Sequence, residues 1–403
     1  MRKIEELLSE TEKSWAGEVF EKIHKKLDWV SEKNREKIPY TTQADGSYAD
    51  RSDQAAFGED WGLGMSWWTN GFWAGLLWQM YHATGEKKYM EIAGISEKKM
   101  DACFLQYYGL HHDVGFMWMP TAVADYRLTG NPESRKRGLL AAQLLAGRYN
   151  PAGAFIRAWN DIPDADATGW AIIDCMFNIS LLYWASEETG DPRFCEIARK
   201  HADTVQKTFI REDGSSNHIV EFDPVKGGVV RTHGGQGYRN GSAWTRGQAW
   251  ALYGFTISYL HTGKKEYLET AKKVADYFSA HMREDGIIPV DFLQPAKPDL
   301  EDSCGAVVAA GGFLELAECI LKGEDGTPED NREAAAGKYL EAALRILYGI
   351  DEKRSCWGKE CDAIVQNCTG AYHSSDHHIT MVYADYYFVE AILKLTGNGF
   401  FMW

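Results

Sequence analysis

Two aspartates stand among large apolar and aromatic residues, and their setting suits acid–base chemistry. Asp113 lies in the stretch HDVGFMW (residues 112–118), and Asp174 lies in IIDCMFN (residues 172–178). A carboxylate in apolar surroundings loses hydration, so its pKa rises unless a partner stabilises the charge. Two carboxyl groups with different surroundings can divide acid, base and stabilising roles at neutral pH. The alternative is structural, with each Asp capping a helix or pairing with an Arg.

Composition and charge narrow the class of partner. The 403 residues carry a net charge of −15, which argues against nucleic acid or an anionic membrane as a partner. A small anionic substrate needs only a local cationic pocket. The chain has 15 Trp residues, several of them beside Gly, Asn or Arg. Indole faces stack on sugar rings, although they also fill cores.

The N-terminal 30 residues predict an amphipathic charged helix rather than a signal peptide, because they lack an apolar core. No apolar run is expected to span a membrane. We therefore expect a cytoplasmic protein, a monomer or small homo-oligomer, with its eight cysteines reduced.

A Thr-Gly pair recurs along the chain and predicts its organisation. It stands at residues 84–85, 129–130, 189–190, 262–263 and 396–397, each time after an apolar helical pattern. Gly there supplies a left-handed helix C-cap. Aromatic-rich patterns precede the turns, and more polar, Ala-rich ones follow the first four, which indicates pairs of one inner and one outer helix.

Further helices are expected at residues 304–321, 331–347 and 378–395, and strand signals are few, at 227–231 and 287–292. The coherent solution is one domain, residues 1–403, built as an all-α (α/α)6 barrel. In such a ring the loops that enter the inner helices gather at one mouth, where Asp113 and Asp174 would both lie.

Five motifs in this order resemble the unsaturated glucuronyl hydrolases, glycoside hydrolase family 88. They are WTNGFW (68–73), HDVGF (112–116), IDCMFN (173–178), WTRGQAW (244–250) and YADYY (383–387). The resemblance implies an (α/α)6 barrel without metal or organic cofactor. It also implies removal of the unsaturated uronic acid that polysaccharide lyases leave at the non-reducing end of oligosaccharides.

The resemblance further implies roles for individual residues. Asp113 and Asp174 match the two essential carboxylates. Sugar-contacting positions fall on Trp68, Trp159, His218, Gln236, Trp244, Arg246 and Trp250. Tyr372 and His373 are candidates for the leaving sugar, with a His where the family pattern has Ser. Local sequence leaves structural alternatives open: Arg246 could pair with an internal Asp, and one of Trp244 and Trp250 is expected to pack while the other lines the cavity.

The implied chemistry is hydration of a vinyl ether, since the substrate has a C4=C5 double bond attached to the ring oxygen. Asp174 would protonate C4 and then accept a proton from water. Asp113 would hold a sugar hydroxyl and keep Asp174 protonated. The two-carboxylate attack at the anomeric carbon that most glycosidases use is not required.

Other functions stay open at this point. An unsaturated rhamnogalacturonyl hydrolase shares barrel and chemistry, but its members more often show Arg-Gly-Asn-Gly-Trp where this chain has RGQAW (246–250). A sugar 2-epimerase would use paired His residues, and a non-catalytic toroid would bind sugar with aromatics alone. Cys356, Cys361 and Cys368 with the three His of segment 373–378 are dense enough for zinc, but they lack a Cys-x-x-Cys pair, and a reduced loop is favoured.

Overall fold

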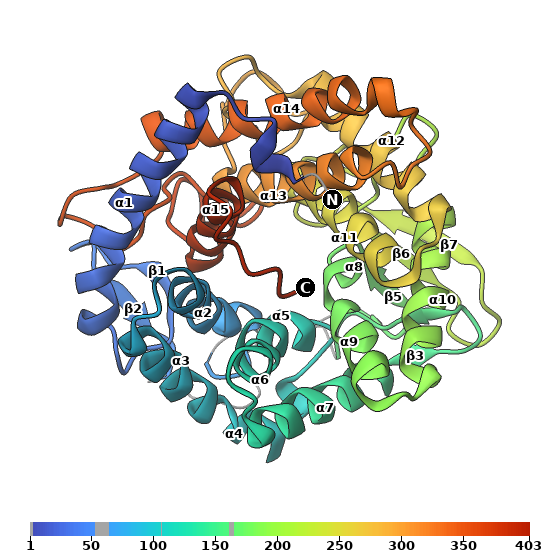
Figure 1. The fold of residues 1–403 in the computed structure, drawn as a ribbon. Coiled ribbons are helices and arrows are strands. Elements are labelled where there is room, and N and C mark those ends of the chain that lie inside the picture. Colours follow the sequence, from blue (N-terminus) through green and yellow to red (C-terminus); the bar gives the residue numbers. More distant parts are fainter. Residues whose placement is uncertain (1–2, 53–63, 106, 161–164) are drawn as a thin grey trace.

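The computed structural model describes residues 3–52, 64–105, 107–160 and 165–403, and its helices form two concentric rings (Figure 1). The outer ring consists of α1 (Glu10–Lys33), α3 (Lys87–Met100), α7 (Pro132–Ala146), α10 (Pro192–Thr208), α12 (Lys265–His281) and α14 (Arg332–Lys353). The inner ring consists of α2 (Phe72–Thr84), α5 (Val114–Trp118) with α6 (Ala124–Thr129), α8 (Cys175–Asn178) with α9 (Ser180–Thr189), α11 (Thr245–Thr262), α13 (Ser303–Leu321) and α15 (Val382–Leu395).

Each inner helix packs on the outer helix that follows it, and α15 packs on α1, which closes the ring. Inner helices such as α11 and α13 are buried along nearly their whole length, whereas α10 buries one stripe. A helix that is apolar all round needs partners on every side, and the inner ring supplies them. The (α/α)6 barrel expected from the sequence is therefore confirmed.

The Thr-Gly pairs end inner helices as expected. Gly85, Gly130, Gly190 and Gly263 have φ between 65° and 77°, the left-handed region that a C-cap requires. The preceding Thr has a role that the sequence did not reveal. Its hydroxyl donates to the carbonyl four residues back, at 2.6–2.9 Å, and accepts the amide two residues ahead, at 3.2 Å. The Thr hydroxyl thereby supplies a hydrogen-bond partner to a carbonyl in the last turn of the helix and to the amide that follows the Gly.

Short strands lie in the loops at the mouth of the barrel. Two hairpins pair β1 (Pro39–Thr42) with β2 (Tyr48–Asp50) and β3 (Tyr149–Asn150) with β4 (Phe155–Ile156). A three-stranded antiparallel sheet has the order β5 (Trp170–Ile172), β6 (Ile219–Phe222), β7 (Val229–His233). The strand signal at 227–231 corresponds to β7. The one at 287–292 is wrong, because that segment makes only isolated bridges, Trp244 with Asp291 and Pro289 with Glu301.

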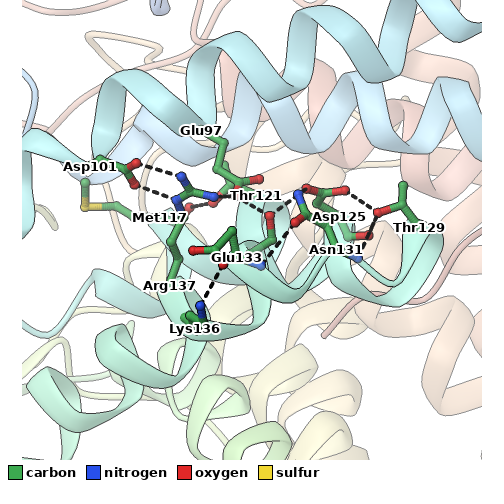
Figure 2. Close-up of polar contacts among 11 residues, drawn as sticks. Glu97, Asp101, Met117, Thr121, Asp125, Thr129, Asn131, Glu133, Lys136 and Arg137 are labelled. Carbon is green, nitrogen blue, oxygen red and sulfur yellow. Dashed lines mark hydrogen bonds and ion pairs between the residues drawn. The ribbon is translucent and has the colours of Figure 1, made fainter.

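A polar network holds α3, α6 and α7 together on the side of the barrel (Figure 2). Arg137 of α7 binds both carboxylate oxygens of Asp101 at 2.6 and 2.7 Å, and it reaches Glu97 of α3 at 3.0 Å. The Asp125 carboxylate of α6 accepts from Thr129 and Asn131, each at 2.7 Å. These contacts join the outer helices α3 and α7 to each other and α7 to the inner helix α6.

Two features of the barrel interior were not expected. Ser303–Leu321 (α13) is long and apolar enough to cross a membrane, contrary to the sequence-based expectation, and 94% of its apolar window is buried inside the ring. The apolar residues of α13 therefore pack inside the barrel, as in a core helix of the inner ring. The C-terminus enters the centre of the ring (Figure 1), where Trp403 is fully buried and donates its indole N–H to Glu390 at 2.9 Å.

Candidate active site

Asp113 and Asp174 immediately precede adjacent inner helices, α5 and α8. Each occupies the N-cap position, yet neither carboxylate makes a capping hydrogen bond. The helix-capping alternative is therefore excluded for both residues. Both side chains are buried at the end of the barrel where the loops enter, and Asp174 Oδ1 has no hydrogen-bond partner among the described protein groups.

Asn178 links the two aspartates, and the sequence did not single it out as a site residue. Its Nδ2 donates to Asp113 Oδ1 at 2.9 Å and to the Asp174 carbonyl at 3.3 Å, while its Oδ1 accepts the Phe116 amide at 2.7 Å. The close approach of α5 and α8 requires Gly115, where a Cβ would lie 2.4 Å from Asn178 Cα. The spacing of four residues after Asp174 was the available signal, because i and i+4 share a helix face.

The electrostatics of the pair follow from burial. Burial raises the pKa of Asp174 to about 7, against the opposing charge of Arg246. Burial also raises the pKa of Asp113 well above its usual range; the charge of Asp174 adds to this effect, and the hydrogen bond from Asn178 opposes it. Both carboxyl groups therefore hold protons at pH values where an exposed Asp is ionised.

His218 faces Asp174 in a defined tautomer. Its Nδ1 accepts the backbone N–H of Gln236 at 3.0 Å, so the proton of the neutral ring is on Nε2. Burial lowers the pKa of His218 to about 3, which keeps the ring neutral. Nε2 lies 3.7 Å from Asp174 Oδ1. The sheet makes this possible because Ile172 pairs with Ile219 and Ile219 with His233, which brings the three loops to one sheet end.

Arg246 has the internal partner that was the alternative interpretation. In the first turn of α11, its Nη1 binds the buried Asp302 carboxylate and the Thr369 carbonyl, and its Nη2 donates to the Gly370 carbonyl at 2.7 Å. Its guanidinium lies 4.6 Å from the Trp244 ring centroid. Its charge still acts on Asp174. Direct contact of Arg246 with substrate stays a prediction.

A distant segment docks beside His218. Gln236 Nε2 donates to the Gly370 carbonyl, and the Tyr372 amide donates to the Gln236 carbonyl, both at 2.8 Å. His373 is exposed, and its Nε2 lies 2.7 Å from the Tyr238 carbonyl oxygen. Gln236, Tyr372 and His373 thus lie together on the side of the site next to His218, and their contact with sugar stays a prediction.

The four candidate tryptophans occupy different depths. Trp68 and Trp159 are half-buried; Trp68 contacts Tyr383 and Phe116 with ring centroids at 4.9 and 5.4 Å. Trp159 lies 6.4 Å from the His112 ring, and Trp244 lies 4.2 Å from the His218 ring. Trp250 is fully buried against Phe116 and Phe177, behind the two aspartates. Trp244 is buried as well, so which of the two indoles lines the cavity stays a prediction.

The cysteine-rich segment does not gather into a metal site in the part of the chain that the structure describes. Cys356, Cys361 and Cys368 are buried free thiols. Within the described ranges, one group of His, Cys, Asp or Glu residues is close enough to hold an ion, and it is His111, His112 and Asp113. That segment 356–378 is a reduced loop stays a prediction.

A helical double ring with paired, buried carboxyl groups at one end places the protein among the (α/α)6-barrel glycoside hydrolases. More specifically, the chain belongs to glycoside hydrolase family 88, since the sequence pattern of Glycosyl Hydrolase Family 88 matches residues 32–344.

Relatives and solved structures agree with this membership. The chain is 36% identical to an unsaturated glucuronyl hydrolase from Bacillus sp. (strain GL1), over 81% of this chain and 86% of the relative. It is 31% identical to an unsaturated chondroitin disaccharide hydrolase from Streptococcus pyogenes serotype M1, over 81% and 80%. The crystal structure of an unsaturated glucuronyl hydrolase from Streptococcus agalactiae superposes with a TM-score of 0.84, at 26% identity, covering 98% of this chain and 94% of the other.

Proposed function

We propose that this protein removes the 4,5-unsaturated uronic acid from the non-reducing end of glycosaminoglycan-type oligosaccharides that lyases have produced. Family membership and relatives named for unsaturated glucuronides and chondroitin disaccharides support the substrate class. One observation carries the mechanism. The Asp174 carboxyl is buried, has its pKa raised to about 7, and has one oxygen without a hydrogen-bond partner among the described protein groups.

The reaction follows from the vinyl ether. Asp174 transfers its proton to C4, which leaves positive charge shared between C5 and the ring oxygen. Water then adds to C5, and its proton returns to the Asp174 carboxylate. The resulting hemiketal opens and rearranges, and the leaving sugar departs as an alcohol. One water is consumed, and the protonated acid is regenerated.

The surroundings of the two aspartates support different roles for them. A group that gives and then takes back a proton works best with a pKa near the working pH, which describes Asp174. Burial and the charge of Asp174 raise the pKa of Asp113 well above its usual range, although the hydrogen bond from Asn178 to Asp113 Oδ1 opposes this rise. We assign Asp113 the role of holding a sugar hydroxyl. Burial, rather than the charge of Asp113, is the main cause that keeps Asp174 protonated.

The test is a panel of unsaturated disaccharides from chondroitin, hyaluronan, heparin and pectin lyase digests. Loss of alkene absorbance reports turnover, and one solvent deuterium at C4 of the released sugar reports the protonation step. Saturated glucuronides are the matched control and should not react. Turnover of the pectin product alone would select the rhamnogalacturonyl alternative, and comparable cleavage of saturated glucuronides would refute the hydration route.

The same proposal places the enzyme in the cytoplasm, as a monomer or small homo-oligomer that acts on free oligosaccharides rather than on nucleic acid or membranes. All eight cysteines are free thiols, which supports a reducing compartment. The net charge of −15 disfavours polyanionic partners. Cell fractionation and light scattering test these two statements.

A further inference from the structure

His111, His112 and Asp113 present three ligand atoms to one point at the edge of the proposed active site. All lie within 4.8 Å of one another. His111 Nδ1 is 3.3 Å from Asp113 Oδ2, and His112 Nε2 is 3.4 Å from Asp113 Oδ1. Tetrahedral ligands about 2.0–2.1 Å from a Zn²⁺ ion are separated by about 3.3–3.4 Å. The two His–Asp distances, which involve different oxygens of Asp113, therefore lie close to the ligand separations of a zinc site.

A second observation points independently to a ligand. His112 is fully buried, and neither of its ring nitrogens makes a hydrogen bond to a described protein group. Burying a polar nitrogen without a partner is costly, and a bound metal would satisfy Nε2.

The ligands are held in place by their neighbours. Asn178 donates to Asp113 Oδ1, and the His112 amide donates to the Ala158 carbonyl at 3.1 Å. Such outer contacts orient ligands. One nearby charge opposes a cation: Arg148, whose guanidinium is bonded to Asn160 Oδ1 and to the carbonyls of Arg157 and Ala158. When they are ionised, the carboxylates of Asp113 and Asp174 offset the positive charge of Arg148.

We propose that His111, His112 and Asp113 form a three-ligand Zn²⁺ site, and that zinc bound there inhibits the enzyme by occupying Asp113. Two imidazoles and one carboxylate suit zinc and not the oxygen-seeking Mg²⁺ or Ca²⁺. The binding claim is independent of the proposed function, whereas the inhibition rests on it. Zn²⁺ at this site would therefore act as an inhibitor, because the proposed acid–base reaction itself uses no metal.

Calorimetric titration of metal-free protein with ZnCl2 tests the binding. We expect one site per chain, weakened at least about 10- to 100-fold by His111→Gln. His24→Gln is the matched control, since His24 is also half-buried but lies on α1 beside Glu86. The absorption spectrum of the protein with Co²⁺ in place of Zn²⁺ identifies the ligand type. A cysteine thiolate bound to Co²⁺ would add an intense near-ultraviolet band, which nitrogen and oxygen ligands lack.

Equal zinc binding by wild type and His111→Gln, or a cobalt–thiolate band, would overturn the proposal. Thermal melting establishes that the variant is folded. In parallel, zinc should inhibit turnover of the unsaturated disaccharide, and a chelator should restore it. Zinc binding at this site without inhibition would refute the inhibitory role. Absence of turnover altogether would refute the proposed function and leave the binding result intact.

Discussion

Asp174 Oδ1 and His218 Nε2 lie 3.7 Å apart, and neither atom has a hydrogen-bond partner among the described protein groups. The separation is slightly longer than a hydrogen bond. Because the Gln236 amide fixes the proton on Nε2, His218 presents a donor to the Asp174 oxygen that we propose takes part in proton transfer. Asp174 can thus be protonated and uncommitted in the resting site, and its carboxylate gains a donor close by once the proton has left.

Asp174→Asn should lower kcat by about 10² to 10⁴ while leaving folding and substrate binding nearly intact, because an amide has the shape of the acid but no acidic proton. Steady-state kinetics and binding of the unsaturated disaccharide measure the two effects. Asp166→Asn, at an exposed Asp in the preceding loop, is the control. Near-normal turnover in Asp174→Asn would remove this residue from the mechanism.

The raised pKa of Asp174 predicts a pH dependence of both activity and stability. As an acid with a pKa of about 7 it is deprotonated above that pH, so kcat/KM should fall there. Between 3.8 and about 7 the native protein binds more protons at this site than the unfolded chain does. The free energy of unfolding therefore falls with rising pH, by up to about 1.4 kcal/mol per unit from this group.

Asp174→Asn removes that contribution, because its amide does not titrate. Its Tm should therefore rise relative to wild type as the pH goes from about 5 to about 7. Calorimetric melting at several pH values measures the difference. A constant offset between the two proteins over this range would show that burial does not raise the Asp174 pKa.

Arg246→Ala should destabilise the fold by about 3–5 kcal/mol, because it leaves the buried Asp302 carboxylate without its cation. Arg246→Lys retains the charge and should lose less, although it cannot reproduce the contacts to Asp302, Thr369 and Gly370 together. Denaturant unfolding and kinetics on each variant separate stability from substrate use. An unchanged unfolding free energy with a large loss of kcat/KM would instead assign Arg246 directly to substrate.

Gly235→Ala should reduce activity by displacing His218. Gly235 has a φ of +55°, and an added Cβ would lie 2.0 Å from His218 Nδ1. Gly241→Ala is a matched control, since Gly241 has a φ of +78° but no atom within 4 Å of the added Cβ. Both variants incur backbone strain of about 1–2 kcal/mol, so both should melt earlier. Only Gly235→Ala should lower kcat/KM, and equal activity of the two would deny His218 a positioning role.

Exhaustive chelation should leave activity intact or raise it, since the proposed acid–base route uses no metal. Turnover before and after dialysis against a chelator, with metal content measured by mass spectrometry, provides the test. Loss of activity that zinc restores would contradict both the mechanism and the inhibitory role of the His111–His112–Asp113 site.

The sequence by itself determined the periodic and local features of this protein. The Thr-Gly pairs located the ends of inner helices, because a left-handed cap is a property of a few adjacent residues. Aromatic helices before the turns and more polar ones after the first four predicted the double ring. The position of Asp113 and Asp174 just before inner helices predicted that they would meet at one end.

Only the tertiary structure decided which side chains meet. Arg246 binds Asp302, 56 positions away, and Asn178 binds Asp113, 65 positions away. Trp244 and Trp250 of the same motif are both buried, but Trp244 lies against His218 whereas Trp250 packs on Phe116 and Phe177. No local pattern encodes these choices, because closing the ring sets which residues of different helix pairs become neighbours. For the same reason residues 287–292, strand-like in sequence, form no strand: their neighbours offer only isolated bridges.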